Sequence, residues 1–233
     1  MQLKKISLII FLAFLTIAGS AQSLLPTKFG IKAGLNFSSP NISTVDGVKP
    51  TINSSKIGIA AGIFFHVPLS DKWYINPELL YSQKGASFHY DFTHDYPDDK
   101  RAEYTTTNQL TLSYIELNPT MSFKASEKLA LNFGPSVSYL ISEDYTITSA
   151  KTSGEDATGV NVLLDGLYES TALDIGLNLG LSYFITANFI VDTKVSTGFM
   201  KIGEVIQPNE KTDPDPAYTL KNRAIVLSLA YLF

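Results

Sequence analysis

The sequence predicts an all-β fold, an eight-stranded antiparallel up-and-down β-barrel that spans a membrane. Three observations lead to this prediction. Eight segments alternate apolar and polar residues, and short connections between them alternate with long ones. After Gln22 the chain has no run of about 18 apolar residues that could cross a membrane as a helix. Because lipid cannot satisfy the backbone groups of an open sheet edge, strands that span a membrane must close into a barrel.

Composition favours a membrane protein and excludes one class of partner. Charged residues make up 17% of the chain, below the roughly 25% of soluble domains, while 45% of residues are hydrophobic and 12% aromatic. The net charge of -4 and the pI near 5.4 provide no basic surface of the kind that binds nucleic acid. We therefore expect no nucleic-acid partner. A length of 233 residues suits a single barrel domain.

The first 21 residues have the pattern of a signal peptide. Lys4 and Lys5 precede an apolar run over residues 6–17, and four small residues follow, ending at Ala21. The run is about a dozen residues long, shorter than the roughly 20 that span a bilayer as a helix. Since the chain has no cysteine, neither lipidation of the mature N-terminus nor a disulfide is expected. We expect Sec-type export, cleavage of residues 1–21 near Ala21, and a barrel domain over residues 22–233.

The first four predicted strands cover residues 29–37, 56–67, 73–84 and 115–123. Each places apolar residues on one face and polar or small residues on the other, as a strand between lipid and a polar interior must. Their apolar faces consist of Phe29, Ile31, Ala33, Leu35 and Phe37; Ile57, Ile59, Ala61, Ile63, Phe65 and Val67; Trp73, Ile75, Leu79 and Tyr81; and Ile115, Leu117, Met121 and Phe123.

The last four predicted strands cover residues 129–141, 173–185, 189–199 and 225–233, and the third of them is the weakest because Thr193 and Thr197 interrupt its apolar face. Pro77, Pro119 and Pro135 lie inside predicted strands, where the missing N–H predicts bulges or weakened pairing. The apolar faces consist of Leu129, Leu131, Phe133, Val137, Tyr139 and Ile141; Leu173, Ile175, Leu177, Leu179, Leu181, Tyr183 and Ile185; Phe189, Val191, Val195 and Phe199; and Ile225, Leu227, Leu229, Tyr231 and Phe233.

The connections alternate in length. Residues 68–72, 124–128 and 186–188 form tight turns, whereas residues 38–55, 87–108, 142–170 and 203–220 form long polar loops. Short periplasmic turns and long external loops are typical of outer-membrane barrels, and eight strands bring both termini to the periplasmic rim.

Aromatic residues gather where the predicted strands meet the short turns, which predicts a girdle at the membrane interface. The alternative is that they fill the core of a soluble protein. The alternation that ends at the terminal aromatic predicts an assembly signal read by the outer-membrane barrel-insertion machinery, formed by Ile225, Leu227, Leu229, Tyr231 and Phe233. The predicted girdle consists of Phe29, Phe64, Phe65, Trp73, Tyr74, Phe123, Tyr183, Phe184, Phe189, Tyr231 and Phe233.

Several segments resemble the PorT-like outer-membrane β-barrel family of Bacteroidota. They are FGIKAGLNFS, YINPELLYSQKG, YIELNP, LNFGPSVSYL and DIGLNLGLSYF, together with the terminal aromatic residue. The resemblance extends over nearly all of residues 22–233 and implies the outer membrane of a Gram-negative cell envelope. For the founding member of the family it implies a part in type IX protein secretion. It assigns no functional residue to this chain.

The faces predicted to point inward carry four cations and four anions. The interior of an eight-stranded barrel is only wide enough to be filled by side chains, so we expect a paired charge network and not a water-filled pore. An alternative is that Glu78 and Glu116, on neighbouring strands, form an acid pair of the kind found among catalytic carboxylates. The eight residues of the predicted network are Lys32, Lys56, Glu78, Lys84, Glu116, Asp174, Asp192 and Lys194.

The three histidines give little indication of a catalytic or metal site. His66 lies at the periplasmic end of a predicted strand and is interpreted as an interfacial residue. His89 and His94 share the second long loop with four aspartates, Asp91, Asp95, Asp98 and Asp99, which leaves open a loose metal site or a hydrolase-like cluster. A solvated loop is the simpler interpretation, and the Asp213-Pro214-Asp215-Pro216 run reads as a turn. We predict no catalytic residue, no metal and no cofactor.

The sequence therefore predicts an integral outer-membrane protein without enzymatic activity, in an envelope-structural or secretion-accessory role. Its expected partners are membrane lipid, the insertion machinery and secretion-system or surface proteins that contact the external loops. Two alternatives stay open. One is an outer-membrane enzyme that modifies lipid or peptide, using His89 or His94. The other is a soluble lipocalin-like barrel that binds a ligand and places its apolar face inward.

Overall fold

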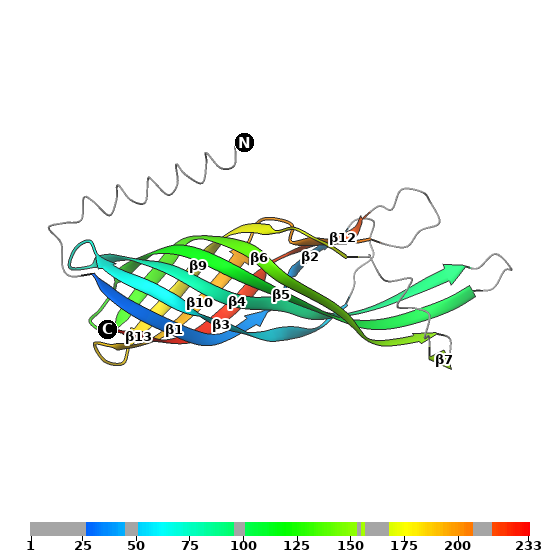
Figure 1. Cartoon of the computed structure of the whole chain (residues 1–233), viewed down its shortest axis with the longest axis horizontal. Coiled ribbons are helices and arrows are strands. Elements are labelled where there is room, and N and C mark those ends of the chain that lie inside the picture. Colours follow the sequence, from blue (N-terminus) through cyan, green and yellow to red (C-terminus); the bar gives the residue numbers. More distant parts are fainter. Residues whose placement is uncertain (1–26, 45–50, 96–100, 153–154, 157–167, 207–215) are drawn as a thin grey trace, which may run out of the picture.

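The computed structural model describes residues 27–44, 51–95, 101–152, 155–156, 168–206 and 216–233, so the predicted signal peptide lies outside the described residues. Eight long antiparallel strands form a closed ring (Figure 1). Each pairs with the next one along the chain, and β1 pairs with β13 from Gly30 opposite Leu232 to Ser38 opposite Ala224. The strands are β1 (Lys28–Ser38), β3 (Thr51–Pro68), β4 (Trp73–Asp95), β5 (Arg101–Lys124), β6 (Leu129–Thr152), β9 (Leu173–Phe184), β10 (Phe189–Gly198) and β13 (Arg223–Leu232).

The predicted eight-stranded up-and-down barrel is confirmed, and so is its alternation of faces. Within the barrel, odd-numbered side chains point outward and even-numbered ones inward on all eight strands, up to the bulge at Ile141 of β6. A lipocalin-like barrel needs the opposite arrangement, and that alternative is therefore wrong. The exposed fractions of representative residues are 49% for Ile59, 48% for Leu79, 41% for Leu177 and 50% for Leu229, against 9% for Lys32 and 4% for Glu78. No helix in the described part of the chain is long and apolar enough to cross a membrane.

Three short turns at one end of the barrel share a local design. In each, a Ser or Thr hydroxyl accepts a hydrogen bond from the N–H three residues later, a common way to satisfy a turn. The pairs are Trp73 N to Ser70 Oγ at 3.2 Å, Leu129 N to Ser126 Oγ at 3.1 Å and Phe189 N to Thr186 Oγ1 at 3.0 Å. The tight turns predicted from the sequence are confirmed, and we call this end of the barrel the turn rim.

The prolines weaken strand pairing as predicted but cause no bulge. Pairing between β3 and β4 is interrupted from Phe64 opposite Glu78 to Val67 opposite Ile75, where Pro77 lies. Pairing between β5 and β6 is likewise interrupted around Pro119 and Pro135, with an unchanged register on either side. A missing N–H removes a ladder hydrogen bond without displacing the chain.

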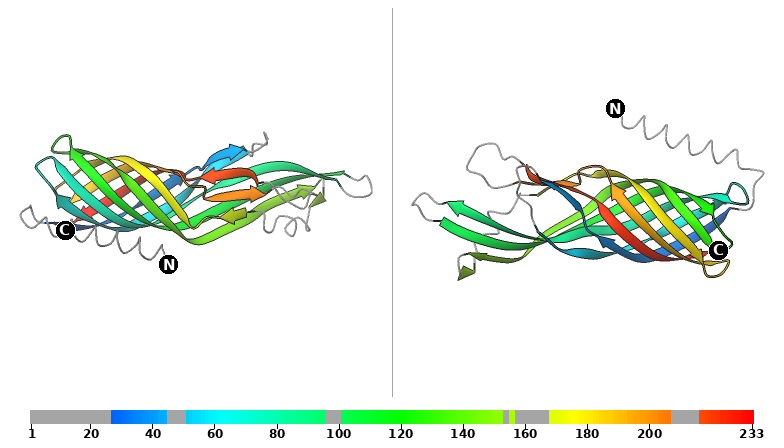
Figure 2. Two further views of the ribbon diagram at one scale, coloured as in Figure 1. Left: turned by 90° about the horizontal axis from the view of Figure 1, so that it is seen from above. Right: turned by 180° about the vertical axis from the view of Figure 1, so that it is seen from behind.

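The prediction of irregular long loops is wrong for most of the described residues. β4, β5 and β6 continue far beyond the barrel end opposite the C-terminus and project from it as a ribbon (Figures 1 and 2). The physical reason is that the strand pattern continues into these segments, with β-branched residues such as Thr105, Thr106 and Thr107 and buried residues such as Phe88 and Leu110 at even positions.

A second, smaller sheet lies at the same end and also replaces predicted loop. Its strand order is β2-β12-β11-β8, all antiparallel. β7 adds a short strand to the outer part of β6. The bounds are β2 (Asn41–Thr44), β7 (Glu155–Asp156), β8 (Tyr168–Ser170), β11 (Gly203–Ile206) and β12 (Pro216–Lys221).

Candidate functional site

The lumen nearer the turn rim is crossed by a chain of ion pairs. The Lys32 ammonium lies 2.5 Å from Glu78 Oε1 and 2.5 Å from Asp192 Oδ2. Lys194 Nζ lies 3.0 Å from the other Glu78 oxygen. These side chains come from β1, β4 and β10, which are not neighbours in the ring, so the ion pairs connect separate parts of the wall. Ser182 donates a further hydrogen bond to Asp192.

A second charged layer lies nearer the projecting strands. Lys84 Nζ lies 2.6 Å from Glu116 Oε1, and Asn222 Nδ2 donates to Asp174 Oδ2 at 2.8 Å. The Lys84 ammonium also lies 5.4 Å from the centre of the Tyr114 ring, within cation–π range. The carboxylates of this layer are thus held by a cation or an amide in the interior of the barrel.

Asparagines connect the two charged layers, a role that the sequence analysis did not predict. Asn178 Nδ2 donates to Asn118 Oδ1 at 3.1 Å, and Asn36 Nδ2 donates to Ser82 Oγ at 2.8 Å. In the sequence, their even-numbered positions on the strands are the one feature that indicates that they face the lumen. Polar side chains therefore fill the middle of the lumen.

Two details of the predicted charge network differ in the structure. Lys56 is half-buried and has no salt bridge to any described residue, and its aliphatic chain lies beside the Gly85 backbone on β4. Glu78 and Glu116 bind different lysines, so the alternative of an acid pair is wrong. Their strands pair with Glu78 opposite Asn118, which offsets the two carboxylates along the barrel.

Apolar clusters close both ends of the charged lumen. At the turn rim, inward-facing Phe64, Ile190, Ala230 and Leu232 pack together with Phe184. At the other end, β4 and β5 pack against residues next to and within the small sheet, which buries the seven residues Ala86, Phe88, Leu110, Leu112, Tyr114, Ile202 and Leu220. We call the second group the outer cluster. Sequence analysis missed it because its members were assigned to loops or left outside the predicted strands.

The barrel fold agrees with a comparison of the sequence with known families. The family model described as outer membrane protein beta-barrel domain matches residues 20–204. The chain belongs to the outer membrane protein beta-barrel domain family. Membership implies the outer membrane, so the turn rim is the periplasmic rim and the projecting strands are external.

The chain was also compared with curated proteins and with solved structures. No curated protein matches this barrel in sequence. Among solved structures, Neisserial surface protein A is 12% identical, with 90% of this chain and 100% of that chain covered and a TM-score of 0.46. Outer membrane protein W of Escherichia coli is 15% identical, with coverages of 88% and 97% and a TM-score of 0.35. The outer membrane protease OmpT of Escherichia coli is 14% identical, with coverages of 90% and 99% and a TM-score of 0.40.

The periplasmic rim carries aromatic rings on its outer surface, including the last residue of the barrel. Phe233 stacks on Phe29 with ring centres 5.8 Å apart, and its N–H donates to Phe29 O at 2.8 Å. Trp73 contacts Phe123 at 4.9 Å. Ile225, Leu227 and Leu229 of the predicted assembly signal are exposed on β13.

Three members of the predicted girdle face the lumen instead of lipid. Phe64 and Tyr74 are buried, and Phe184 is half-buried against the cluster at the periplasmic rim. The reason is strand parity, because all three have even numbers whereas the outward face consists of odd-numbered residues.

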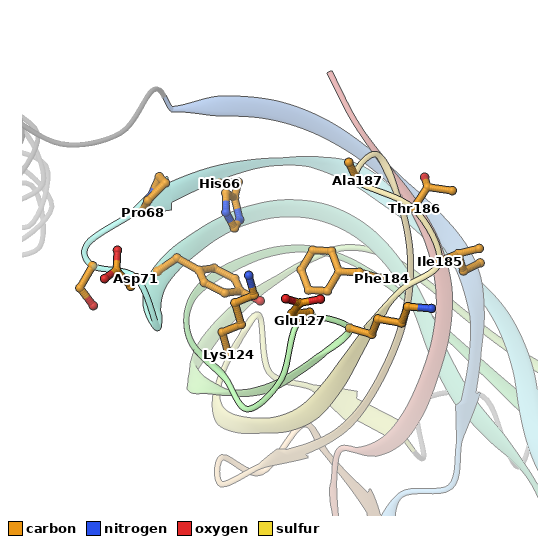
Figure 3. Close-up of a pocket in the computed structure, with 12 residues that line it drawn as sticks. His66, Pro68, Asp71, Lys124, Glu127, Phe184, Ile185, Thr186 and Ala187 are labelled. Atoms are coloured by element: carbon orange, nitrogen blue, oxygen red, sulfur yellow. The ribbon is translucent and has the colours of Figure 1, made fainter.

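A pocket of about 740 Å³ opens at the periplasmic mouth between the three turns (Figure 3). His66 lines it, with Nδ1 3.1 Å from Asn76 Oδ1 and its ring 4.3 Å from that of Tyr74. His66 thus lies at the periplasmic end of its strand, as predicted, with its ring facing the mouth of the barrel. Four charged residues complete the rim of the pocket, and none of them forms a salt bridge with a described residue: Asp71, Lys124, Glu127 and Lys128.

The structure describes the side chain of one of the two histidines predicted for the second external segment. His89 lies on β4 with Nδ1 3.3 Å from Thr107 Oγ1. The side chains of His94, Asp91 and Asp95, and all of Asp98 and Asp99, lie outside what the structure describes, as do residues 213–215. Within the described residues, no group of three or more histidines and carboxylates is placed to hold a metal ion.

Proposed function

We propose that this outer-membrane barrel neither conducts solutes nor catalyses a reaction, and that it acts through its projecting strands in an envelope-structural or secretion-accessory role. The observation that carries the proposal is the lumen, where ion pairs and amides lie between two apolar clusters. A solute would have to pass both clusters and separate the ion pairs.

The energy needed to separate the ion pairs favours a permanently closed lumen. Separating a buried lysine from its carboxylates leaves uncompensated charges at low dielectric, which costs about 3–5 kcal/mol for one broken pair. The ion pairs of Lys32 join β1 to both β4 and β10, so opening a path also requires these strands to move relative to one another. A small barrel whose wall is held in this way is suited to present external structure at a fixed height above the membrane.

The proposed absence of catalysis rests on the burial and pairing of the acidic residues in the lumen. Glu78, Glu116 and Asp174 are buried and bound to lysine or asparagine, so none faces a space that a substrate could enter. His66 contacts an amide, Asn76, in place of the carboxylate that would orient a general base.

The proposed partners of the barrel rest on sequence motifs. Resemblance to PorT-like barrels favours a secretion-system or surface protein as the partner of the external strands. The exposed alternation from Ile225 to Phe233 supports recognition by the barrel-insertion machinery during assembly.

Single-channel recording tests the closed lumen. After insertion into planar bilayers in 1 M KCl, the protein is expected to produce no stable conductance steps over several minutes at moderate voltage. Insertion is checked separately by the shift in gel mobility on heating. Regular, long-lived conductance steps from a preparation that is fully folded by the gel assay would overturn the proposal.

A further inference from the structure

Four polar side chains border the lipid-facing surface at the external end of the barrel. β13 lies between β1 and β10 in the ring (Figure 2). Arg223 begins β13 opposite Thr197 of β10, and its carbonyl oxygen accepts a hydrogen bond from Ser39 N at 2.9 Å. Since adjacent strands lie about 4.8 Å apart, these three residues form a row across the wall. Lys221, the last residue of β12, lies two residues farther from the membrane.

The four side chains of this group face outward. Successive side chains along a strand point to opposite faces, and both sequence neighbours of each of these residues are buried. Asn222, between Lys221 and Arg223, is an example, since it bonds to a carboxylate inside the barrel. Arg223 and Thr197 are exposed, whereas Lys221 and Ser39 are half-buried. The row therefore lies on the same face as the apolar residues that contact lipid.

The row lies directly outside the lipid-facing residues. Two residues toward the periplasm, Ile225 pairs with Phe37 of β1 and with Val195 of β10, and all three are exposed. Ten residues separate Arg223 from Phe233 at the periplasmic rim. At about 3.3 Å per residue and a tilt of about 40°, this is about 25 Å, the height of the apolar band of such barrels. Arg223 thus lies where the headgroups of the outer leaflet begin.

No described group of the protein neutralises the two cations. Neither Arg223 nor Lys221 forms a salt bridge with a described residue, and the hydroxyl groups of Ser39 and Thr197 make no hydrogen bond there. A phosphate offers several strong acceptor oxygens, which suit a guanidinium fork, an ammonium group and hydroxyl donors together. Because the row adjoins the acyl chains, the nearest source of phosphate is a lipid headgroup.

We propose that Arg223 and Lys221, together with the two hydroxyl groups of the same row, bind the phosphate of an anionic lipid in the outer leaflet. The acyl chains of this lipid lie against Ile225 and its two apolar neighbours. One basic residue near an anionic lipid surface increases binding about fivefold, and the two cations act together. The site does not depend on whether the lumen conducts, so its failure would leave the proposed function untouched.

Tryptophan quenching by brominated lipid tests the site. The chain has one tryptophan, Trp73, at the periplasmic rim. The variant W73F/F199W moves this reporter to an exposed position two residues after Thr197. The barrel is refolded in nanodiscs of phosphatidylcholine and phosphatidic acid, with bromine near the headgroup on the acyl chains of one lipid at a time. We expect phosphatidic acid to be enriched about fivefold or more around the reporter. Quenching in proportion to the bulk composition would refute the proposal.

Variants of the two cations locate the site. In the reporter background, R223Q/K221Q should abolish the enrichment. R223K should reduce it although the charge is unchanged, because lysine lacks the planar fork of arginine. The matched control K124Q/K128Q removes two lysines at the periplasmic rim and should leave the enrichment unchanged. Equal loss in the control, or full enrichment in R223K, would contradict the site.

A competition experiment distinguishes lipid from free phosphate. Excess inorganic phosphate should leave the quenching by brominated phosphatidic acid unchanged. Displacement of the lipid would indicate a site for the free anion and would overturn the assignment to a headgroup. Folding of every variant is checked by the shift in gel mobility on heating. W73F/M200W, with the reporter at another exposed position of the same segment, replaces F199W if that variant does not refold.

Discussion

Replacing Lys32 by methionine is expected to lower the free energy of unfolding of the barrel by about 3–5 kcal/mol. Methionine retains much of the volume but removes the ammonium that lies 2.5 Å from both Glu78 and Asp192. Lys194 still neutralises Glu78, whereas Asp192 loses its salt bridge and, among the described residues, keeps the hydrogen bond from the Ser182 hydroxyl. Urea unfolding in lipid vesicles, followed by the fluorescence of Trp73 and by gel mobility, measures the change.

Two variants separate the loss of pairing from the loss of charge. Lys28→Met, at the exposed start of β1, should change stability by less than about 0.5 kcal/mol. The double variant K32M/D192N removes the unpaired carboxylate as well and should recover a substantial part of the stability. If K32M costs no more than K28M, the ion pairs do not hold the wall together and the argument for a closed lumen loses its main support.

Replacing Leu179 by arginine is expected to destabilise the barrel by about 2–4 kcal/mol, the cost of a cation on the lipid face near the middle of the bilayer. Leu179 is 57% exposed and lies in the centre of β9, opposite Val195 on β10 and Phe133 on β6. The same urea titration measures the effect. Thr146→Arg adds the same charge to an exposed position outside the membrane, where a change within about 0.5 kcal/mol is expected. Equal effects at both positions would mean that Leu179 does not face lipid.

Strand parity explains how much of this barrel could be predicted from its sequence. Alternation alone identified eight strands, their faces and the three tight turns, because a strand between lipid and lumen must change character at every residue. The same rule, applied more strictly, would also have placed Phe64 and Tyr74 inside the barrel. Their proximity to outward-facing aromatic residues in the sequence explains why the predicted girdle includes them.

The external half and the pairing of charges could not be predicted in the same way. Phe88, Leu110 and Leu220 are buried only because a second sheet covers the projecting strands, and its pairing joins segments far apart in the sequence. The sequence also indicated charges in the lumen without indicating which ones meet. Lys32 reaches Glu78 and Asp192 because β1 lies two strands from each in the ring, a consequence of closure that strand patterns do not contain.

Methyl NMR in nanodiscs tests most directly whether odd-numbered side chains contact lipid while even-numbered ones fill the lumen. With labelled leucine methyl groups, Leu79, Leu177 and Leu229 are expected to show nuclear Overhauser effects to the acyl chains of the lipid. Leu80 and Leu232, buried on the other face of their strands, should show none. Acyl-chain contacts at Leu80 and Leu232, with none at Leu79 and Leu229, would contradict the account.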